Sequence, residues 1–391
     1  MPDPVRRSTR RCTDLRGLMD QHNELSRRGA LKAGVGGLAG GALPLPSEQA
    51  PASSVSTSAD SAAALSAPAT TFEFTAGTNA FVTASPVGDQ LIAGVQGVLW
   101  SIPRTGGPAT ALTPADLEPT RVAWSPDGSR IAVCAYQGGG FHVWTMAPDG
   151  FRQRQLTSGP WDDRGVAWSP DGSRIAFASE RGGDPVAGSS YSVWTVDVRS
   201  GELAQLTDDP DVEDYDPAWH PDGIRLVFVR AGAKGGRTLA SVPAGGGEVS
   251  VARTVDKGTL VGPAVSTDGR VAYVQVGDFV QPFNAASSVL MVDGEPVTDG
   301  EDVSPFPPCW TPKGELFYVA EGQVKVRRPG TAQSTPEQIP FTASLSVSAA
   351  TPQETLRLRL VDPSRGAGNP PVLRWPARQW PARTPELVAR R

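Results

Sequence analysis

The chain has 391 residues, a formal net charge of −5, 43 glycines and 37 prolines. Only 20% of the residues are charged and 10 are tryptophan. This composition is typical of folds in which many turns join short buried strands, so we expect an all-β protein. Residues 53–345 hold 20 Lys and Arg against 33 Asp and Glu, whereas both ends are basic. An acidic body repels phosphate groups, which argues against nucleic acid as a partner of the folded part. The three cysteines, Cys12, Cys134 and Cys309, are too few and too scattered for a disulfide framework or a zinc site.

The amino terminus has the pattern of an export signal. A basic segment precedes residues 33–43, a glycine-rich, weakly apolar run with the length of a signal-peptide h-region and too short for a permanent membrane span. The basic segment resembles the twin-arginine consensus of the Tat pathway in Ser26, Arg27, Arg28, Leu31 and Lys32, with Ala30 where Phe is most common. The resemblance implies that residues 1–52 form a signal peptide region. It also implies folding in the cytoplasm before the Tat translocation machinery exports the chain to the periplasm, the cell surface or the medium. Residues 53–71, rich in Ser and Ala, are predicted to be a flexible linker.

A tight turn of the Ser-Pro-Asp-Gly type recurs six times along the chain. The turn glycines, which lie 40, 44, 51, 46 and 45 residues apart, are Gly88, Gly128, Gly172, Gly223, Gly269 and Gly314. Proline pre-sets φ, aspartate bonds the following backbone and glycine accepts a positive φ, so each turn predicts a β-hairpin. The strand after each turn is apolar on both faces, and two further strands follow in the same order. Four strands at this period predict one propeller blade per repeat.

These units resemble the WD-like repeats of the TolB-type six-bladed propellers, which also occur in front of some secreted hydrolase domains. The resemblance covers residues 72–345 and implies an all-β, six-bladed β-propeller. Residues 72–74 are expected to pair with the last blade and close the ring, because closure removes exposed strand edges. Residues 338–343 are similar to a propeller exit that leads, in longer proteins, toward an amidohydrolase domain. The Arg- and Pro-rich residues 346–391 are predicted to be a disordered tail, or to mark a chain truncated relative to a longer parent.

The sequence contains no recognisable constellation of catalytic residues, so we expect no enzyme activity, no cofactor and no metal. Only His142 and His220 follow the signal region, whereas an amidohydrolase needs several histidines, including a His-x-His pair. A prolyl-peptidase-like enzyme needs a serine in a G-x-S-x-G elbow, which is absent from the sequence. We interpret His142, in a predicted strand, and His220, in a turn, as structural residues.

Two acidic connections between a fourth strand and the next first strand are candidates for a binding surface. Connections of this kind lie at one mouth of a propeller channel, so their side chains are expected to gather near the axis, with an aromatic contact before the sixth blade. The predicted binding residues are Trp161, Asp162, Asp163, Arg164, Asp214, Tyr215, Asp216 and Phe306. The order of a calcium loop is missing, so no metal is predicted. A solvated acidic rim with no specific ligand is the alternative.

Two functions remain open from the sequence. The first is a non-catalytic, monomeric scaffold in the cell envelope that binds a protein, a peptide or a glycan through its loops. The second is the propeller portion of a truncated or split secreted hydrolase, amidohydrolase or prolyl-peptidase-like, that lacks its catalytic domain. A weaker third hypothesis is a lyase-type or hydrolytic propeller that uses the channel carboxylates. Fold alone does not choose among them.

Overall fold

The computed structural model describes residues 69–348, except 115–116, 138, 185–188, 233–235, 256–257, 278–287 and 331–334. The described residues belong to one compact unit, Ala67–Arg391. The predicted signal region and nearly all of the predicted linker and tail lie outside them. Strands begin at Ala69 in β1 and end at Ser348 in β27, slightly beyond the predicted range 72–345. In the described part of the chain, no helix has the length and apolar character needed to cross a membrane.

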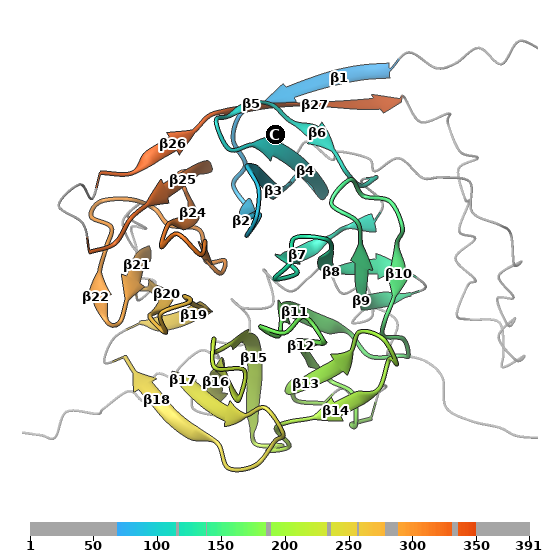
Figure 1. The fold of residues 1–391 in the computed structure, drawn as a ribbon, viewed down its shortest axis with the longest axis vertical. Helices are drawn as coiled ribbons and strands as arrows, with labels where there is room; N and C mark the ends of the chain where they lie inside the picture. The colour runs from blue at the N-terminus through green and yellow to red at the C-terminus, as the bar shows by residue number, and fades with distance from the viewer. Residues whose placement is uncertain are drawn as a thin grey trace, which may run out of the picture. The chain divides into compact units, whose positions relative to one another are not determined.

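Six four-stranded antiparallel sheets, each made of strands that follow one another along the chain, are arranged around a central axis (Figure 1). From the innermost strand outward, blade 1 is formed by β2 (Phe81–Ala84), β3 (Gln90–Val95), β4 (Val98–Pro103) and β6 (Thr110–Ala111). Blade 2 is formed by β7 (Thr120–Trp124), β8 (Ile131–Gln137), β9 (Gly140–Met146) and β10 (Arg154–Gln155). Blade 3 is formed by β11 (Asp163–Trp168), β12 (Arg174–Ser179), β13 (Ser192–Asp197) and β14 (Leu203–Gln205). Blade 4 is formed by β15 (Val212–Trp219), β16 (Arg225–Gly232), β17 (Arg237–Pro243) and β18 (Ser250–Thr254). Blade 5 is formed by β19 (Thr259–Val265), β20 (Val271–Val276), β21 (Ser288–Val292) and β22 (Glu295–Pro296). Blade 6 is formed by β23 (Cys309–Trp310), β24 (Leu316–Ala320), β25 (Gln323–Arg327) and β26 (Glu337–Ile339). The predicted six-bladed propeller is confirmed.

The recurring turn forms the hairpin between the first and second strands of each blade. In blade 2 the Gly128 N–H donates to the Ser125 carbonyl at 2.9 Å, and Gly128 has a φ of 70°. The Ser125 hydroxyl donates to Asp127 Oδ1 at 2.6 Å and accepts the Arg130 N–H at 2.9 Å. Blade 3 repeats this arrangement with Ser169 and Asp171. The turn is therefore held by side chains that the repeat itself supplies.

A threonine after the fourth strand anchors four of the blades from within. Its Oγ1 accepts a backbone N–H of the third strand of the same blade, and each of these threonines is buried. The pairs of acceptor and donor are Thr113 with Leu99, Thr157 with Val143, Thr207 with Val193, and Thr298 with Leu290. The short outer strand is thus fixed by one side-chain bond in addition to its few ladder bonds.

The ring closes through residues 341–348, a segment outside the six repeats that we call the strap. The six innermost strands contact one another in sequence, and β23 of blade 6 returns to β2 of blade 1. Directly after blade 6, β27 (Phe341–Ser348) runs parallel to β5 (Gly107–Pro108), which lies between β4 and β6 in the chain, and antiparallel to β1 (Ala69–Phe74). The expectation that residues 72–74 pair with the last blade is thus modified, because blade 6 has four strands of its own and β1 pairs with the segment that leaves it.

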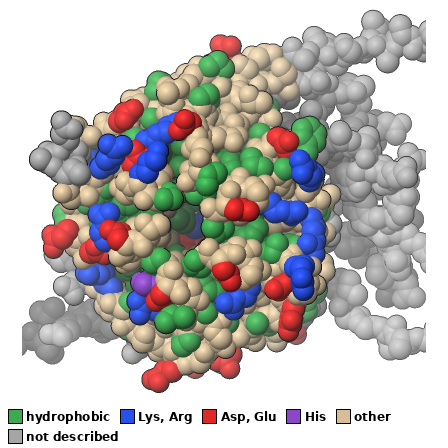
Figure 2. All heavy atoms as spheres, viewed as in Figure 1, with side chains coloured by type: hydrophobic (Ala, Val, Ile, Leu, Met, Phe, Trp, Pro, Cys, Tyr) green, Lys and Arg blue, Asp and Glu red, His purple; other side chains and the backbone are tan. Residues whose placement is uncertain are grey.

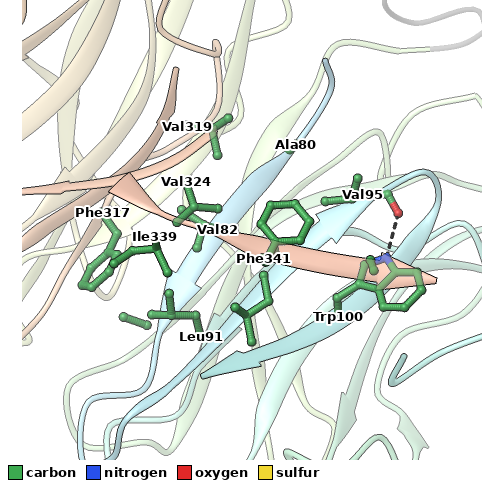
Figure 3. Packing of buried hydrophobic residues seen from close by; sticks show 14 of the residues in the cluster. Ala80, Val82, Leu91, Val95, Trp100, Phe317, Val319, Val324, Ile339 and Phe341 are labelled. Carbon is green, nitrogen blue, oxygen red and sulfur yellow. Dashed lines mark hydrogen bonds between the residues drawn. The ribbon is translucent and has the colours of Figure 1, made fainter. Parts of the chain in front are cut away.

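Apolar packing fills the seam between the first and last blades (Figure 3). Phe341 of the strap lies between Trp100 of blade 1 and Phe317 of blade 6 in this cluster, and all three side chains are at most 2% exposed. The buried Trp100 Nε1 donates to the Val95 carbonyl at 3.1 Å. At about 25 cal/mol per Å² of buried apolar surface, such a cluster is a main source of the free energy that holds the ring shut.

Candidate functional site at the propeller axis

The innermost strands of blades 2 to 5 each contain a bulge at the same place. The residue three positions before the end of each strand has a left-handed backbone, and the ladder shifts register there. These residues, with their φ angles, are Arg121 (49°), Gly165 (57°), Asp216 (53°) and Gly262 (60°). A left-handed φ costs a residue with a Cβ about 1–2 kcal/mol. Arg121 and Asp216 therefore hold strained positions, a feature that clusters at functional sites.

Arg121 and Asp216 form an ion pair that links blade 2 to blade 4. Arg121 Nη1 lies 2.7 Å from Asp216 Oδ1. Blade 3 lies between them and presents Gly165, at which a Cβ would lie 3.6 Å from the same Oδ1 atom. The other carboxylate oxygen, Oδ2, accepts the N–H of Gly262 in blade 5 at 3.2 Å. Four successive blades thus contribute their bulge residues to one contact.

Aromatic side chains from blades 1 and 6 complete the arrangement. The Arg121 Cζ lies 5.6 Å from the centre of the Phe306 ring, which precedes β23, and Phe306 meets Phe81 of β2 edge to face at 5.8 Å. The backbone of Pro307 packs so closely on Gly262 that a Cβ there would lie 2.6 Å from the Pro307 nitrogen. We define the axial cluster as Phe81, Arg121, Gly165, Asp216, Gly262 and Phe306. Figure 2 shows the molecule hollowed at the centre of the ring, with hydrophobic and charged side chains around the hollow.

The guanidinium of Arg121 has unused hydrogen-bonding capacity. Its Nη1 is buried and lies in the ion pair without the alignment of a hydrogen bond, and the side chain as a whole is 23% exposed. Among the residues that the structure describes, the ion pair with Asp216 is the only polar contact found for Nη1. Asp216, by contrast, is 7% exposed and accepts a backbone N–H in addition to the ion pair. Buried donors are normally paired, so the arginine, rather than the aspartate, is the group left to meet a ligand.

The structure brings Asp216 and Phe306 together at the axis and places the other predicted carboxylates elsewhere. Asp163 is fully buried, receives Arg181 Nη2 at 2.9 Å on both oxygens and accepts the Thr157 hydroxyl at 2.5 Å. Asp214 is 1% exposed and is bridged by Arg230 Nε and Nη2, both at 2.8 Å. These ion pairs join the beginning of the innermost strand to the end of the second strand of the same blade. A carboxylate at this depth needs a cationic partner.

The remaining predicted residues make contacts within and between blades. Asp162 accepts the Phe141 N–H at 3.0 Å, and Trp161 Nε1 donates to the Gly183 carbonyl at 3.2 Å. Two aromatic rings lie beneath arginines, with Arg164 over Tyr191 and Arg237 over Tyr215. Burial raises the pKa of Tyr215, whose hydroxyl is buried. In the described part of the chain, no group of three His, Cys, Asp or Glu side chains is placed to hold a metal ion.

Sequence reasoning missed Arg121 and Phe81. A signal was available, because Arg121, Gly165, Asp216 and Gly262 occupy one register position of the repeat, where the neighbouring strand residues are mostly apolar. Two charged residues and two glycines at a repeat position indicate a site where backbone and side chains from different blades meet.

Comparison with known proteins supports the fold. No protein-family profile and no curated protein matches the sequence. Among solved structures, the chain is similar to a TolB protein described as putative from Agrobacterium tumefaciens, at 20% identity and a TM-score of 0.51 over 62% of this chain and 87% of that one. It is also similar to TolB from Acinetobacter baumannii, at 16% identity and a TM-score of 0.49 over 68% of this chain and 65% of that one. A puromycin-hydrolyzing peptidase from Mycobacterium tuberculosis matches at 15% identity and a TM-score of 0.47, over 68% of this chain and 45% of that one. Together with the six four-stranded blades, the first of these likenesses shows that the chain has the fold of a TolB-like six-bladed β-propeller.

Proposed function

We propose that the protein is an exported, non-catalytic binding module of the cell envelope, whose protein partner places a carboxylate against Arg121 in the axial cluster. The observation that carries the proposal is the guanidinium of Arg121, which is held at the axis by the ion pair of its Nη1 with Asp216 and by the Phe306 ring, while its side chain stays 23% exposed. A carboxylate is the group that best matches a guanidinium, because it can accept two parallel N–H bonds.

The strained backbone supports the same proposal. Glycine would hold the bulge positions of blades 2 and 4 without strain, as it does at Gly165 and Gly262. Arg121 and Asp216 instead keep charged side chains there. Asp216 positions the guanidinium from one side, and the Phe306 ring lies against another part of it. The arginine is therefore held in place before a ligand arrives, which lowers the entropic cost of binding.

Peptide selection tests the proposal without a known partner. The mature chain is used to select from a library of displayed peptides, and each selected peptide is synthesised with its carboxylates free or amidated. Dissociation constants are then measured for the wild type, for Arg121→Met, and for Arg199→Met as a control, since Arg199 is exposed in the turn after β13.

We expect the free carboxylate to be required and Arg121→Met to weaken binding by about 10- to 100-fold, the value of a charge-assisted hydrogen bond. Arg199→Met should change the affinity by less than about twofold. Peptides that bind Arg121→Met as tightly as the wild type, or that bind equally well with amidated carboxylates, would contradict the proposed role of the axial cluster. The alternative of a split hydrolase predicts that the DNA downstream encodes a metal-dependent hydrolase with a His-x-His motif. Finding such a gene would contradict the proposal that the protein is a stand-alone binding module.

A further inference from the structure

A second site lies at the seam between the last and first blades. An open pocket of about 420 Å³ is lined by the segment before β2, the turn between β3 and β4, the start of β21, the connection before β23 and the turn between β24 and β25. Its polar lining residues are Thr78, Gln96, Ser288, Asp302, Ser304 and Glu321. The Gly77 N–H donates to the Gly322 carbonyl at 3.0 Å, which joins the two blades at the pocket.

The pocket carries an uncompensated negative charge. Lys325 bonds both Glu301 and Glu321, and Arg327 pairs with Glu301. With Asp302, these residues are three carboxylates against two cations. The carboxylate of Asp302 makes no ion pair and accepts no hydrogen bond among the described residues, and no Lys, Arg or His lines the pocket. Burial, and the negative charge of Glu321, raise the pKa of Asp302.

Ser288 adds an unpartnered hydroxyl. Its side chain is 6% exposed, it lines the pocket, and no hydrogen bond of this hydroxyl to another described residue is found. Ser304, Thr78 and Gln96 supply further oxygen acceptors around the same space. A group with several donors and a positive charge would bond these acceptors together.

We propose that this pocket binds a primary ammonium group, the side chain of a lysine on a protein partner. The ammonium carries three N–H donors and one charge, and it would bond Asp302, Ser288 and a neighbouring hydroxyl. The ammonium is favoured over a guanidinium because its three N–H donors point in tetrahedral directions and so reach a carboxylate and separate hydroxyls, whereas the guanidinium donors lie in one plane.

The position of the pocket next to the axial cluster supports the assignment of the amine to a protein partner. Pro305 lines the pocket, and the next residue, Phe306, belongs to the axial cluster. A partner bound at the axis therefore has the pocket beside it. The assignment to a protein partner rests on the proposed function, whereas the ammonium chemistry of the pocket stands independently.

The probe is Nα-acetyl-lysine methylamide, with its Nε-acetylated form as the neutral counterpart. Saturation-transfer NMR titrations are carried out with the full chain, with Asp302→Asn, with Ser288→Ala, and with Asp299→Asn as the matched control. Asp299 is exposed in the same connection, carries the same charge and does not line the pocket. Thermal unfolding of each variant confirms that it is folded.

We expect the amine to bind the wild type and the acetylated probe to give no transfer. Asp302→Asn should weaken binding at least fivefold, Ser288→Ala two- to fivefold, and Asp299→Asn less than twofold. Binding should also weaken as the pH falls through the raised pKa of Asp302, because the protonated carboxyl no longer attracts the cation. Equal signals from the two probes, or binding that Asp302→Asn leaves unchanged, would overturn the site. Because no partner protein is used, failure at the axial cluster leaves this result unaffected.

Discussion

The guanidinium of Arg174 in blade 3 stacks on the indole of Trp219 in blade 4, with its Cζ 4.9 Å from the ring centre. Its Nη1 also donates to the Ala244 carbonyl of blade 4 at 3.1 Å. The same pairing recurs between Arg270 of blade 5 and Trp310 of blade 6, at 4.7 Å. The arginine after the recurring turn is thus a contact between neighbouring blades.

Arg174→Ala should lower the free energy of unfolding by about 1–2 kcal/mol, since it removes a partly desolvated cation–π contact and a hydrogen bond. Arg199→Ala, at an exposed position in the same blade, should have an effect below about 0.5 kcal/mol. Urea unfolding followed by tryptophan fluorescence measures both. An equal effect of the two changes would show that the stack contributes nothing to the stability of the ring.

Asp163→Asn should be strongly destabilising, by about 3–5 kcal/mol, because it leaves the buried Arg181 without its counter-charge. The double variant Asp163→Leu with Arg181→Met should recover most of this loss, since it removes both charges. Asp89→Asn, at an exposed position, serves as the control. If Asp163→Asn unfolds at the same denaturant concentration as Asp89→Asn, the buried pair is not structural.

The two axial glycines should differ in their tolerance of a side chain. Gly165→Ala places a Cβ in ordinary contact, 3.6 Å from Asp216, so it should cost only the left-handed strain of about 1–2 kcal/mol. Gly262→Ala adds a clash with the Pro307 backbone at 2.6 Å, which no rotamer can relieve. We therefore expect a larger drop in melting temperature for Gly262→Ala, and the reverse order would contradict the close approach of blade 6 to blade 5.

The recurring turns make the stability of the folded protein depend on pH. Hydrogen bonds from Ser125 and Ser169 lower the pKa of Asp127 and Asp171 from the ordinary value of 3.8. A carboxyl with a lowered pKa in the folded state stabilises the protein above its unfolded pKa, and this contribution is lost as the pH falls through the folded pKa. Because both carboxylates are near the surface, each turn should contribute less than about 1 kcal/mol.

Chemical unfolding between pH 6 and pH 2 measures this dependence. The double variant Ser125→Ala with Ser169→Ala should lose less stability between pH 4 and pH 2 than the wild type does. An identical loss in the two proteins would mean that other carboxylates set the acid response.

Export by the Tat pathway is tested by Arg27→Lys with Arg28→Lys. The double change keeps the positive charge of the signal region, so only recognition of the arginine pair should be lost. We expect the full-length precursor to accumulate in the cytoplasmic fraction, whereas the wild type is found outside it. Unchanged export of the double variant would require another route.

The sequence was sufficient for the hairpins and the number of blades, because Ser-Pro-Asp-Gly turns and doubly apolar strands are local signals that recur at one period. It was insufficient for Asp163 and Asp214, whose acidic surroundings indicated a solvated mouth. Their partners, Arg181 and Arg230, lie across the hairpin of the first two strands, so the register of that hairpin brings each pair together. The pair of Arg121 and Asp216 depends further on the bulges and on ring closure, neither of which a single repeat specifies.

The strap has a consequence for the order of folding. The strand pairing that joins Phe72 to Leu345 spans nearly the whole propeller, so it belongs to the slowest class of contacts to form. Until residues 341–348 are synthesised, the six blades lack the pairing of β27 with β1 and β5 that covers the seam. A chain cut before residue 341 would therefore leave the apolar cluster at the seam without Phe341, Ala343 and Leu345, which cover it in the closed ring.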